Sequence, residues 1–145
     1  MMSQPTQYFV ACTVIFNKEG KVLLTKRNNP GNSEVHNKWQ LPGGSVDNAE
    51  HPMDSAIREV KEETGLTIQI ISERPFIFSH TFSDGVHVVL IVYIANYVSG
   101  EVDISQDLDE TLEAKWFLPS EISRLPTLPE TNEIIQATTS SMAKV

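Results

Sequence analysis

A single helix with one apolar face and one acidic face constrains the fold of this chain more than any other feature. Residues Pro52 to Thr64 are expected to be helical, because proline is tolerated in a first helical turn and Gly65 can end the helix. An apolar stripe would hold the helix against a sheet, and it consists of Met53, Ala56, Ile57 and Val60. A neighbouring face carries acids at positions i, i+3 and i+4, namely Glu59, Glu62 and Glu63. The sequence therefore predicts an anchored helix that presents three converging carboxylates on an exposed surface.

The three carboxylates indicate a divalent cation. Like charges at these spacings destabilise a helix by roughly a few tenths of a kcal/mol per pair, and a cation would offset their repulsion. Oxygen ligands without a cysteine or histidine cluster favour Mg²⁺ or Mn²⁺ over Zn²⁺. A solvated helix face would also explain the run Arg-Glu-Val-Lys-Glu-Glu, so the helix alone leaves both interpretations open.

Residues on both sides of the helix extend the acidic face into a longer pattern. From Gly44 to Leu66 the sequence is GSVDNAEHPMDSAIREVKEETGL. The pattern consists of glycine, five residues, Glu50, seven residues, Arg-Glu-Val, any residue, Glu-Glu, any residue, glycine and leucine. It resembles the Nudix box at every defined position, and the preceding Leu-Pro-Gly-Gly resembles the usual approach to that box. The chain is therefore similar to the Nudix hydrolase family, in its MutT-like nucleoside triphosphate pyrophosphohydrolase branch.

The resemblance implies a metal site within the box, residues 44–66. Glu59 and Glu63 would be the core metal ligands. Glu62 would add a ligand or hold a metal-bound water, and the backbone carbonyl of Gly44 would complete the coordination shell. The implied cofactor is Mg²⁺, with Mn²⁺ as a substitute, and both accept oxygen ligands of this kind.

Further catalytic residues are expected beside the metal ligands. By resemblance, Arg58 and Glu50 would orient the metal-binding carboxylates. Helical spacing also allows Arg58 to pair simply with Asp54 or Glu62, which is compatible with that role. The general base is expected in the acidic loop 101–113, where Glu110 stands six residues before a tryptophan and resembles an extra catalytic carboxylate of MutT-type members. Glu113 is the second candidate. A solvated loop would explain any one of the acids in this segment, which are Asp103, Asp107, Asp109, Glu110 and Glu113.

Two residues outside the box are candidate substrate contacts. Arg27 borders the polar loop 28–38 and would meet phosphates, although a solvated cation is the alternative. Asn132 lies in the segment Leu-Pro-Glu-Thr-Asn-Glu, which resembles a segment where MutT-type enzymes place an asparagine against a purine base. A side-chain amide can donate and accept hydrogen bonds at a base edge, but an exposed first-turn residue is the alternative. Stacking on a base is one interpretation of Phe76, Phe78 and Phe82, but their alternate spacing on a strand is more typical of core packing.

The expected activity is hydrolysis of the diphosphate linkage in a nucleoside triphosphate, with modified purine nucleotides among the options, to the monophosphate and diphosphate. The alternative enzyme cleaves another nucleoside diphosphate linked to X, such as a nucleotide sugar or ADP-ribose. ADP-ribose is disfavoured because Thr81, Phe82 and Ser83 stand where that branch has a proline. A non-catalytic nucleotide-binding Nudix domain is the third alternative, disfavoured because all box carboxylates are present.

The remaining signals predict an α/β fold, namely a Nudix-type α/β/α sandwich with a mixed central sheet and a loop–helix–loop catalytic motif, in a single domain 1–145. Strands are expected at 8–16, 21–26, 39–41, 67–72, 75–82, 86–98 and 112–118. Helices beyond the box are expected at 119–125 and 129–139, each beginning at a proline. The segment Pro42 to Gly44 is expected to break the chain.

Composition limits the partners and the compartment. The net charge of −8 disfavours long nucleic acid, because binding by counterion release needs basic side chains. A small nucleotide remains compatible, since bound cations would offset the acids. Met1 to Gln7 lacks the features of a secretory signal, and no apolar run is long enough for a membrane span. With Cys12 expected as a buried thiol, we predict a cytoplasmic protein; the resemblance allows a homodimer.

Overall fold

Strand β1 (Gln7–Phe16) organises an eight-stranded mixed sheet in the computed structural model, which describes residues 6 to 143. It pairs in parallel with β7 along its whole length, from Gln7 opposite His87 to Phe16 opposite Asn96, whereas every other strand pair is antiparallel. The other elements are β2 (Val22–Arg27), β3 (Trp39–Gln40), β4 (Gly43–Ser45), α1 (Pro52–Thr64), β5 (Thr67–Ile70), β6 (Phe76–Thr81), β7 (His87–Ser99), β8 (Thr111–Phe117), α2 (Pro119–Ile122) and α3 (Thr131–Ala143).

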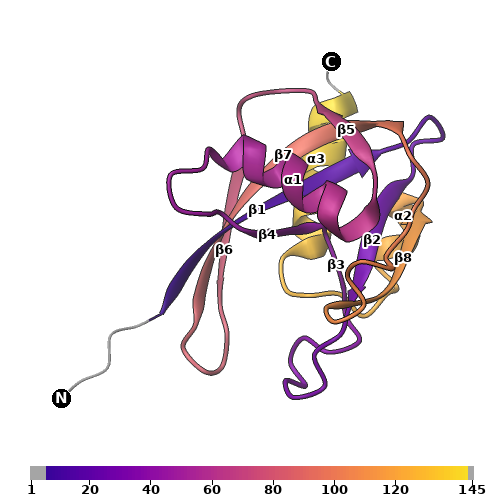
Figure 1. Ribbon diagram of the computed structural model, residues 1–145. Helices are drawn as coiled ribbons and strands as arrows, with labels where there is room; N and C mark the ends of the chain where they lie inside the picture. Colours follow the sequence, from indigo (N-terminus) through magenta and orange to yellow (C-terminus); the bar gives the residue numbers. More distant parts are fainter. Residues whose placement is uncertain (1–5, 144–145) are drawn as a thin grey trace.

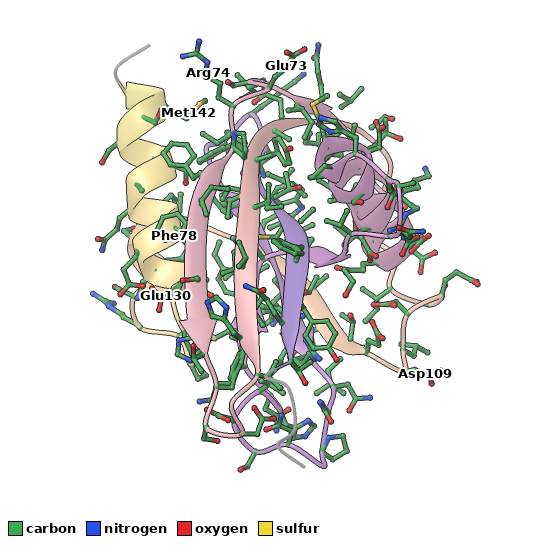
Figure 2. The ribbon with its side chains drawn as sticks, turned by 90° about the vertical axis from the view of Figure 1, so that its left-hand side faces the viewer. Glu73, Arg74, Phe78, Asp109, Glu130 and Met142 are labelled. Carbon is green, nitrogen blue, oxygen red and sulfur yellow. The ribbon has the colours of Figure 1, made fainter. Side chains whose placement is uncertain are left out.

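Helices cover both faces of this sheet, because side chains of a strand point alternately to its two sides. On β1, Val14 belongs to the core cluster that contains Ile134 of α3, while Ile15 belongs to the cluster that contains Val60 of α1. Figure 1 shows α1 and α3 on opposite sides of the sheet, and Figure 2 shows Phe78 between the sheet and α3. The predicted α/β/α sandwich is confirmed.

Strand β4 is the main departure from the predicted elements. The segment expected to break the chain instead pairs with β1, with Gly43 opposite Cys12 and Ser45 opposite Val10. A Cβ atom on Gly43 would collide with the Ala11 carbonyl and with Cys12, so the glycine allows the two backbones to approach closely. This strand brings the start of the box against the centre of the sheet.

The C-terminal helices are shifted from their expected bounds. Helix α2 ends at Ile122 instead of Leu125, and α3 begins at Thr131 instead of Pro129. Glu130 has φ of 72°, a left-handed conformation that is incompatible with a helical residue, and it therefore delays the start of α3.

Two expectations concern residues near the N-terminus. Cys12 is buried, as predicted, and burial followed by the charge of Glu63 raises the pKa of its thiol to about 12. Met1 to Pro5, most of the segment considered for a secretory signal, lies outside the described residues. Within residues 6 to 143, no helix combines the length and hydropathy that a membrane span requires.

Candidate functional site

Helix α1 begins and ends where its sequence predicts. The ring nitrogen Nδ1 of His51 accepts a hydrogen bond from the backbone N–H of Met53 at 3.1 Å, which caps the N-terminus. Pro52 occupies the first turn, and Gly65 adopts a left-handed conformation with φ of 76° while its N–H donates to the Lys61 carbonyl. These caps fix the length of the helix that carries the acidic face.

The guanidinium of Arg58 connects four carboxylates. Its Nε and Nη2 atoms donate to the two oxygens of Glu50, each at 3.0 Å. Its Nη1 atom lies 3.1 Å from an oxygen of Glu59 and 3.1 Å from an oxygen of Glu62, and Nη2 lies 3.4 Å from Asp47. This arrangement suits the orienting role expected for Arg58 and Glu50, since a planar guanidinium fixes the directions of its partners.

Within this ion-pair network, Glu50 and Arg58 stabilise each other's charged forms. Hydrogen bonds from Arg58, followed by one from the Ser55 hydroxyl, lower the pKa of Glu50 to about 2. The same Glu50 carboxylate raises the pKa of Arg58 further above its ordinary value. Glu50 and Arg58 are thus a permanently charged pair that supports the box.

Glu63 is buried at the centre of the site. Only 6% of the residue is exposed, and both carboxylate oxygens accept from the Gly43 N–H at 3.3 Å. Burial raises its pKa well above the ordinary value, with further contributions from the charges of Glu59, Asp107 and Glu110. The expectation of three exposed carboxylates is therefore wrong for Glu63, because strand β4 covers this part of the helix.

Glu59 lies against the glycine that begins the box. A Cβ atom on Gly44 would lie 2.5 to 2.7 Å from the carboxylate atoms of Glu59, so this position accepts no side chain without moving Glu59. Burial raises the pKa of Glu59, while Arg58 opposes that change. Gly44 and Glu59 are thus in direct proximity, as the expected metal shell requires.

The three acids do not converge as the helical spacing suggested. In the part of the chain that the structure describes, no three histidine, cysteine or acidic side chains are gathered closely enough to hold one ion. Glu62, whose side chain is 56% exposed, is paired with Arg58, because a guanidinium offsets carboxylate repulsion. Glu59 and Glu63 nevertheless fit a hard divalent cation. Burial raises the pKa of both and so disfavours their ionised forms, and a nearby positive charge would stabilise those forms.

A cavity of about 600 Å³ opens beside Glu59 and Glu63, a size suited to a nucleotide-sized ligand. Its walls combine the box with β1, the loop 28–38, the hairpin of β6 and β7, the segment before β8 and the start of α3. Apolar side chains contribute much of the lining, including Val10, Val35, Leu41, Phe82, Val88, Leu90, Leu128 and Ile134. The cavity therefore joins a charged region to an apolar region.

The structure separates the candidate general bases. Glu110 and Asp107 line the cavity, whereas Glu113 is not among its lining residues. Lys115 at 3.3 Å and Lys26 at 3.4 Å pair with Glu113, and the hydrogen bond from Lys115 is the main cause of its lowered pKa. The geometry thus favours Glu110 over Glu113 and adds Asp107 as a neighbouring acid.

The two expected substrate contacts lie in different places. Arg27 lines the cavity, but Asn132 instead lines a shallow depression between α2 and α3. Phe76 and Phe78 pack against the core, as their alternation suggested. Sequence reasoning missed several lining residues that only the folding of distant segments brings to the cavity, among them Tyr8, Asn32, Val35 and Thr131.

Comparisons with known proteins find a matching family model, similar sequences and similar structures. Residues 6–138 match the family model of the NUDIX domain. An ADP-ribose pyrophosphatase of Methanocaldococcus jannaschii is 35% identical over 127 residues, which cover 87% of this chain and 69% of that protein. An RNA pyrophosphohydrolase of Bartonella quintana is 41% identical over 73 residues, or 48% of this chain and 42% of that protein, so the match spans less than half of that relative's length. A solved MutT protein of Methanosarcina mazei has a TM-score of 0.78 and 26% identity, with coverage of 99% and 100% of the two chains.

Proposed function

The chain belongs to the Nudix family, and on that premise we propose that it is a magnesium-dependent hydrolase of nucleoside diphosphate linkages, with a nucleoside triphosphate as its leading substrate. From a nucleoside triphosphate and water, the products would be a nucleoside monophosphate and inorganic diphosphate. The observation that carries the proposal is the buried carboxylate of Glu63 and the half-buried carboxylate of Glu59, beside a nucleotide-sized cavity. The proposal treats residues 1–145 as one domain; a cytoplasmic location and a homodimer remain predictions.

Several side chains would share the work of cleavage. Glu59, Glu63 and the Gly44 carbonyl would hold the divalent ion, with Glu62 adding a ligand or holding a metal-bound water. When bound, that ion supplies neutralisation of phosphoryl oxygens and activation of water. Arg58 keeps Glu59 oriented through a contact of 3.1 Å. All these groups belong to strand β4 and helix α1, which limits the movement needed for the reaction.

Residues outside the box would handle the substrate and the proton. Arg27 would bind phosphate oxygens, since it lines the same cavity as Glu59 and Glu63 and a guanidinium suits phosphate. Glu110 would accept the proton of the attacking water, because it lines the same cavity as Glu59 and Glu63 and its charge acts on Glu63. The apolar walls would receive the base and ribose of the nucleotide.

A second substrate class has a specific observation in its favour. The relative that covers 87% of this chain is named an ADP-ribose pyrophosphatase, although the residues after the box had disfavoured ADP-ribose. Both classes contain a nucleoside diphosphate, so the same carboxylates would serve either one. The two substrate classes differ in the group attached to the second phosphate, which is a third phosphate in one class and a sugar such as ribose in the other.

A panel of substrates tests the proposal. It contains the common and oxidised nucleoside triphosphates, ADP-ribose, nucleotide sugars and a short RNA with a 5′-triphosphate, each with Mg²⁺ and with EDTA. Chromatography is expected to show cleavage products in the magnesium samples alone, namely a nucleoside monophosphate and inorganic diphosphate from a nucleoside triphosphate. Cleavage of ADP-ribose in preference to every triphosphate would establish the second class, and no cleavage at all would favour a binding domain.

The general base is tested by a pair of matched substitutions. Glu110→Gln is expected to lower kcat by about 10²-fold, because general-base catalysis contributes on the order of 10²- to 10⁴-fold. Glu113→Gln should leave kcat within about threefold of the parent protein, since this carboxylate is paired with two lysines outside the cavity. Steady-state kinetics on the best substrate decide the assignment. Equal losses in the two variants would remove Glu110 from the mechanism.

A further inference from the structure

Two loops at one end of the molecule are joined by a contact outside the Nudix box. In the loop 28–38, Glu34 accepts hydrogen bonds from the Ser83 hydroxyl at 2.7 Å and from the Ser83 backbone N–H at 3.2 Å. Each bond uses a different carboxylate oxygen, so the contact fixes direction as well as distance. Ser83 lies in the turn between β6 and β7, and Figure 1 shows both loops extending from the same end of the molecule.

The neighbours of this contact line the cavity. Asn32 and Val35 lie on either side of Glu34 in sequence, and Phe82 and Asp84 flank Ser83. All four are lining residues, and Val35 is buried although Ser83 is exposed. The Glu34–Ser83 contact therefore stands at the rim and ties together two cavity walls that are 49 residues apart in sequence.

The root of the same loop is anchored separately. The backbone N–H of Asn28 donates to the Glu110 carbonyl at 2.8 Å, and its side-chain amide donates to the Leu108 carbonyl at 3.1 Å. Breaking the Glu34–Ser83 contact would free the tip of the loop without releasing this root. The segment that carries Glu110 would keep its position.

We propose that Glu34 and Ser83 form a latch that holds the two walls in the arrangement that binds the nucleoside part of the substrate. Both are positioning residues, and their assignment to substrate binding rests on the proposed function. Without the latch, the binding-ready arrangement is populated for only part of the time, and the apparent affinity falls by that fraction. The rate of the bound complex is retained, because Glu59, Glu63 and Arg58 are held by contacts of their own.

Kinetics of latch variants test the proposal. Glu34→Ala is expected to raise KM by about fivefold with kcat within about twofold of the parent, as for an arrangement populated about one-fifth of the time. Ser83→Thr retains both donors and should keep the parent KM. The double variant Glu34→Ala/Ser83→Ala should be no worse than Glu34→Ala, because the two residues act through one contact. Glu19→Ala removes the same charge from a distant turn and serves as the control.

Hydrogen exchange separates failure of the latch from failure of the proposed function. Exchange of the Ser83 amide should accelerate in Glu34→Ala and not in Glu19→Ala, whether or not any nucleotide is cleaved. If the protein is active, an unchanged KM in Glu34→Ala overturns the latch. A lower kcat without a higher KM overturns it as well. In a protein that cleaves nothing on the panel, the proposed function fails, and unchanged Ser83 exchange then overturns the latch by itself.

Discussion

Replacement of Glu63 by glutamine is expected to lower kcat by about 10³-fold or more, because a metal ion contributes several kcal/mol to phosphoryl transfer. Glutamine has nearly the same shape and can still accept the hydrogen bond from the Gly43 N–H, so the fold should survive. It cannot supply the negative charge that a divalent ion needs at this buried position. Initial rates over a range of Mg²⁺ concentrations measure the loss.

The control for this variant is Glu133→Gln, which removes an exposed acid of α3 and should leave the rate unchanged. Circular dichroism distinguishes a lost site from a lost fold. Rates in Glu63→Gln within tenfold of the parent, with the fold intact, would contradict metal binding by Glu63; about three orders of magnitude are expected from the metal alone.

Glu63→Gln is expected to lower activity but, in EDTA, to reduce the loss of thermal stability as pH rises. Burial raises the pKa of Glu63 above its ordinary value of 4.5, so the folded state favours the protonated carboxyl. Stability from this group is therefore present at low pH and is lost as pH rises from that ordinary value through the folded pKa. In EDTA, the parent Tm should fall more than that of Glu63→Gln between about pH 5 and pH 7.

Substitution of alanine for Gly44 should lower kcat by about 10²-fold, the loss that a displacement of about 1 Å in a reacting group can cause. The new Cβ would lie 2.5 to 2.7 Å from the carboxylate of Glu59, which must then move. The displaced carboxylate would lose its position relative to Glu63 and Arg58. Kinetics at saturating Mg²⁺ measure the effect, because raising the metal concentration does not restore the geometry.

Gly31→Ala is the matched control, since a Cβ there would meet only Asn29 Oδ1 at 4.0 Å. It adds the same methyl group to another glycine of the chain without a collision. If both alanine variants retain the parent kcat, close packing of Gly44 against Glu59 has no role in catalysis.

The sequence predicted best those features that depend on neighbouring residues. Helix α1 follows from local signals, since Pro52 and Gly65 mark its ends and the 3.6-residue repeat separates its faces. The mixed sheet follows from strands on both sides of that helix. The burial of Glu63 could not be predicted in this way, because Gly43 covers it only through the pairing of β4 with β1.

The second candidate for the general base, Glu113, and the expected contact to the nucleobase, Asn132, also depend on contacts that the sequence does not reveal. Glu113 lies opposite Lys26 only because β8 pairs with β2, a register that spacing within the loop does not reveal. At the start of α3, the left-handed Glu130 sets the first helical residue, so Thr131 lines the cavity and Asn132 does not. Both outcomes depend on contacts between distant segments.

The parallel pairing of β1 with β7 has a consequence for how the site assembles. Gln7 and His87 lie 80 positions apart, so the central strand pair closes a long loop of chain, and such non-local contacts slow folding. The complete Nudix box is synthesised before β7, yet α1 packs against a sheet that includes β7. A nascent chain that ends after the box would therefore carry its acids and Arg58 without the strand that completes the sheet beneath α1, and we expect the site to assemble only late in translation.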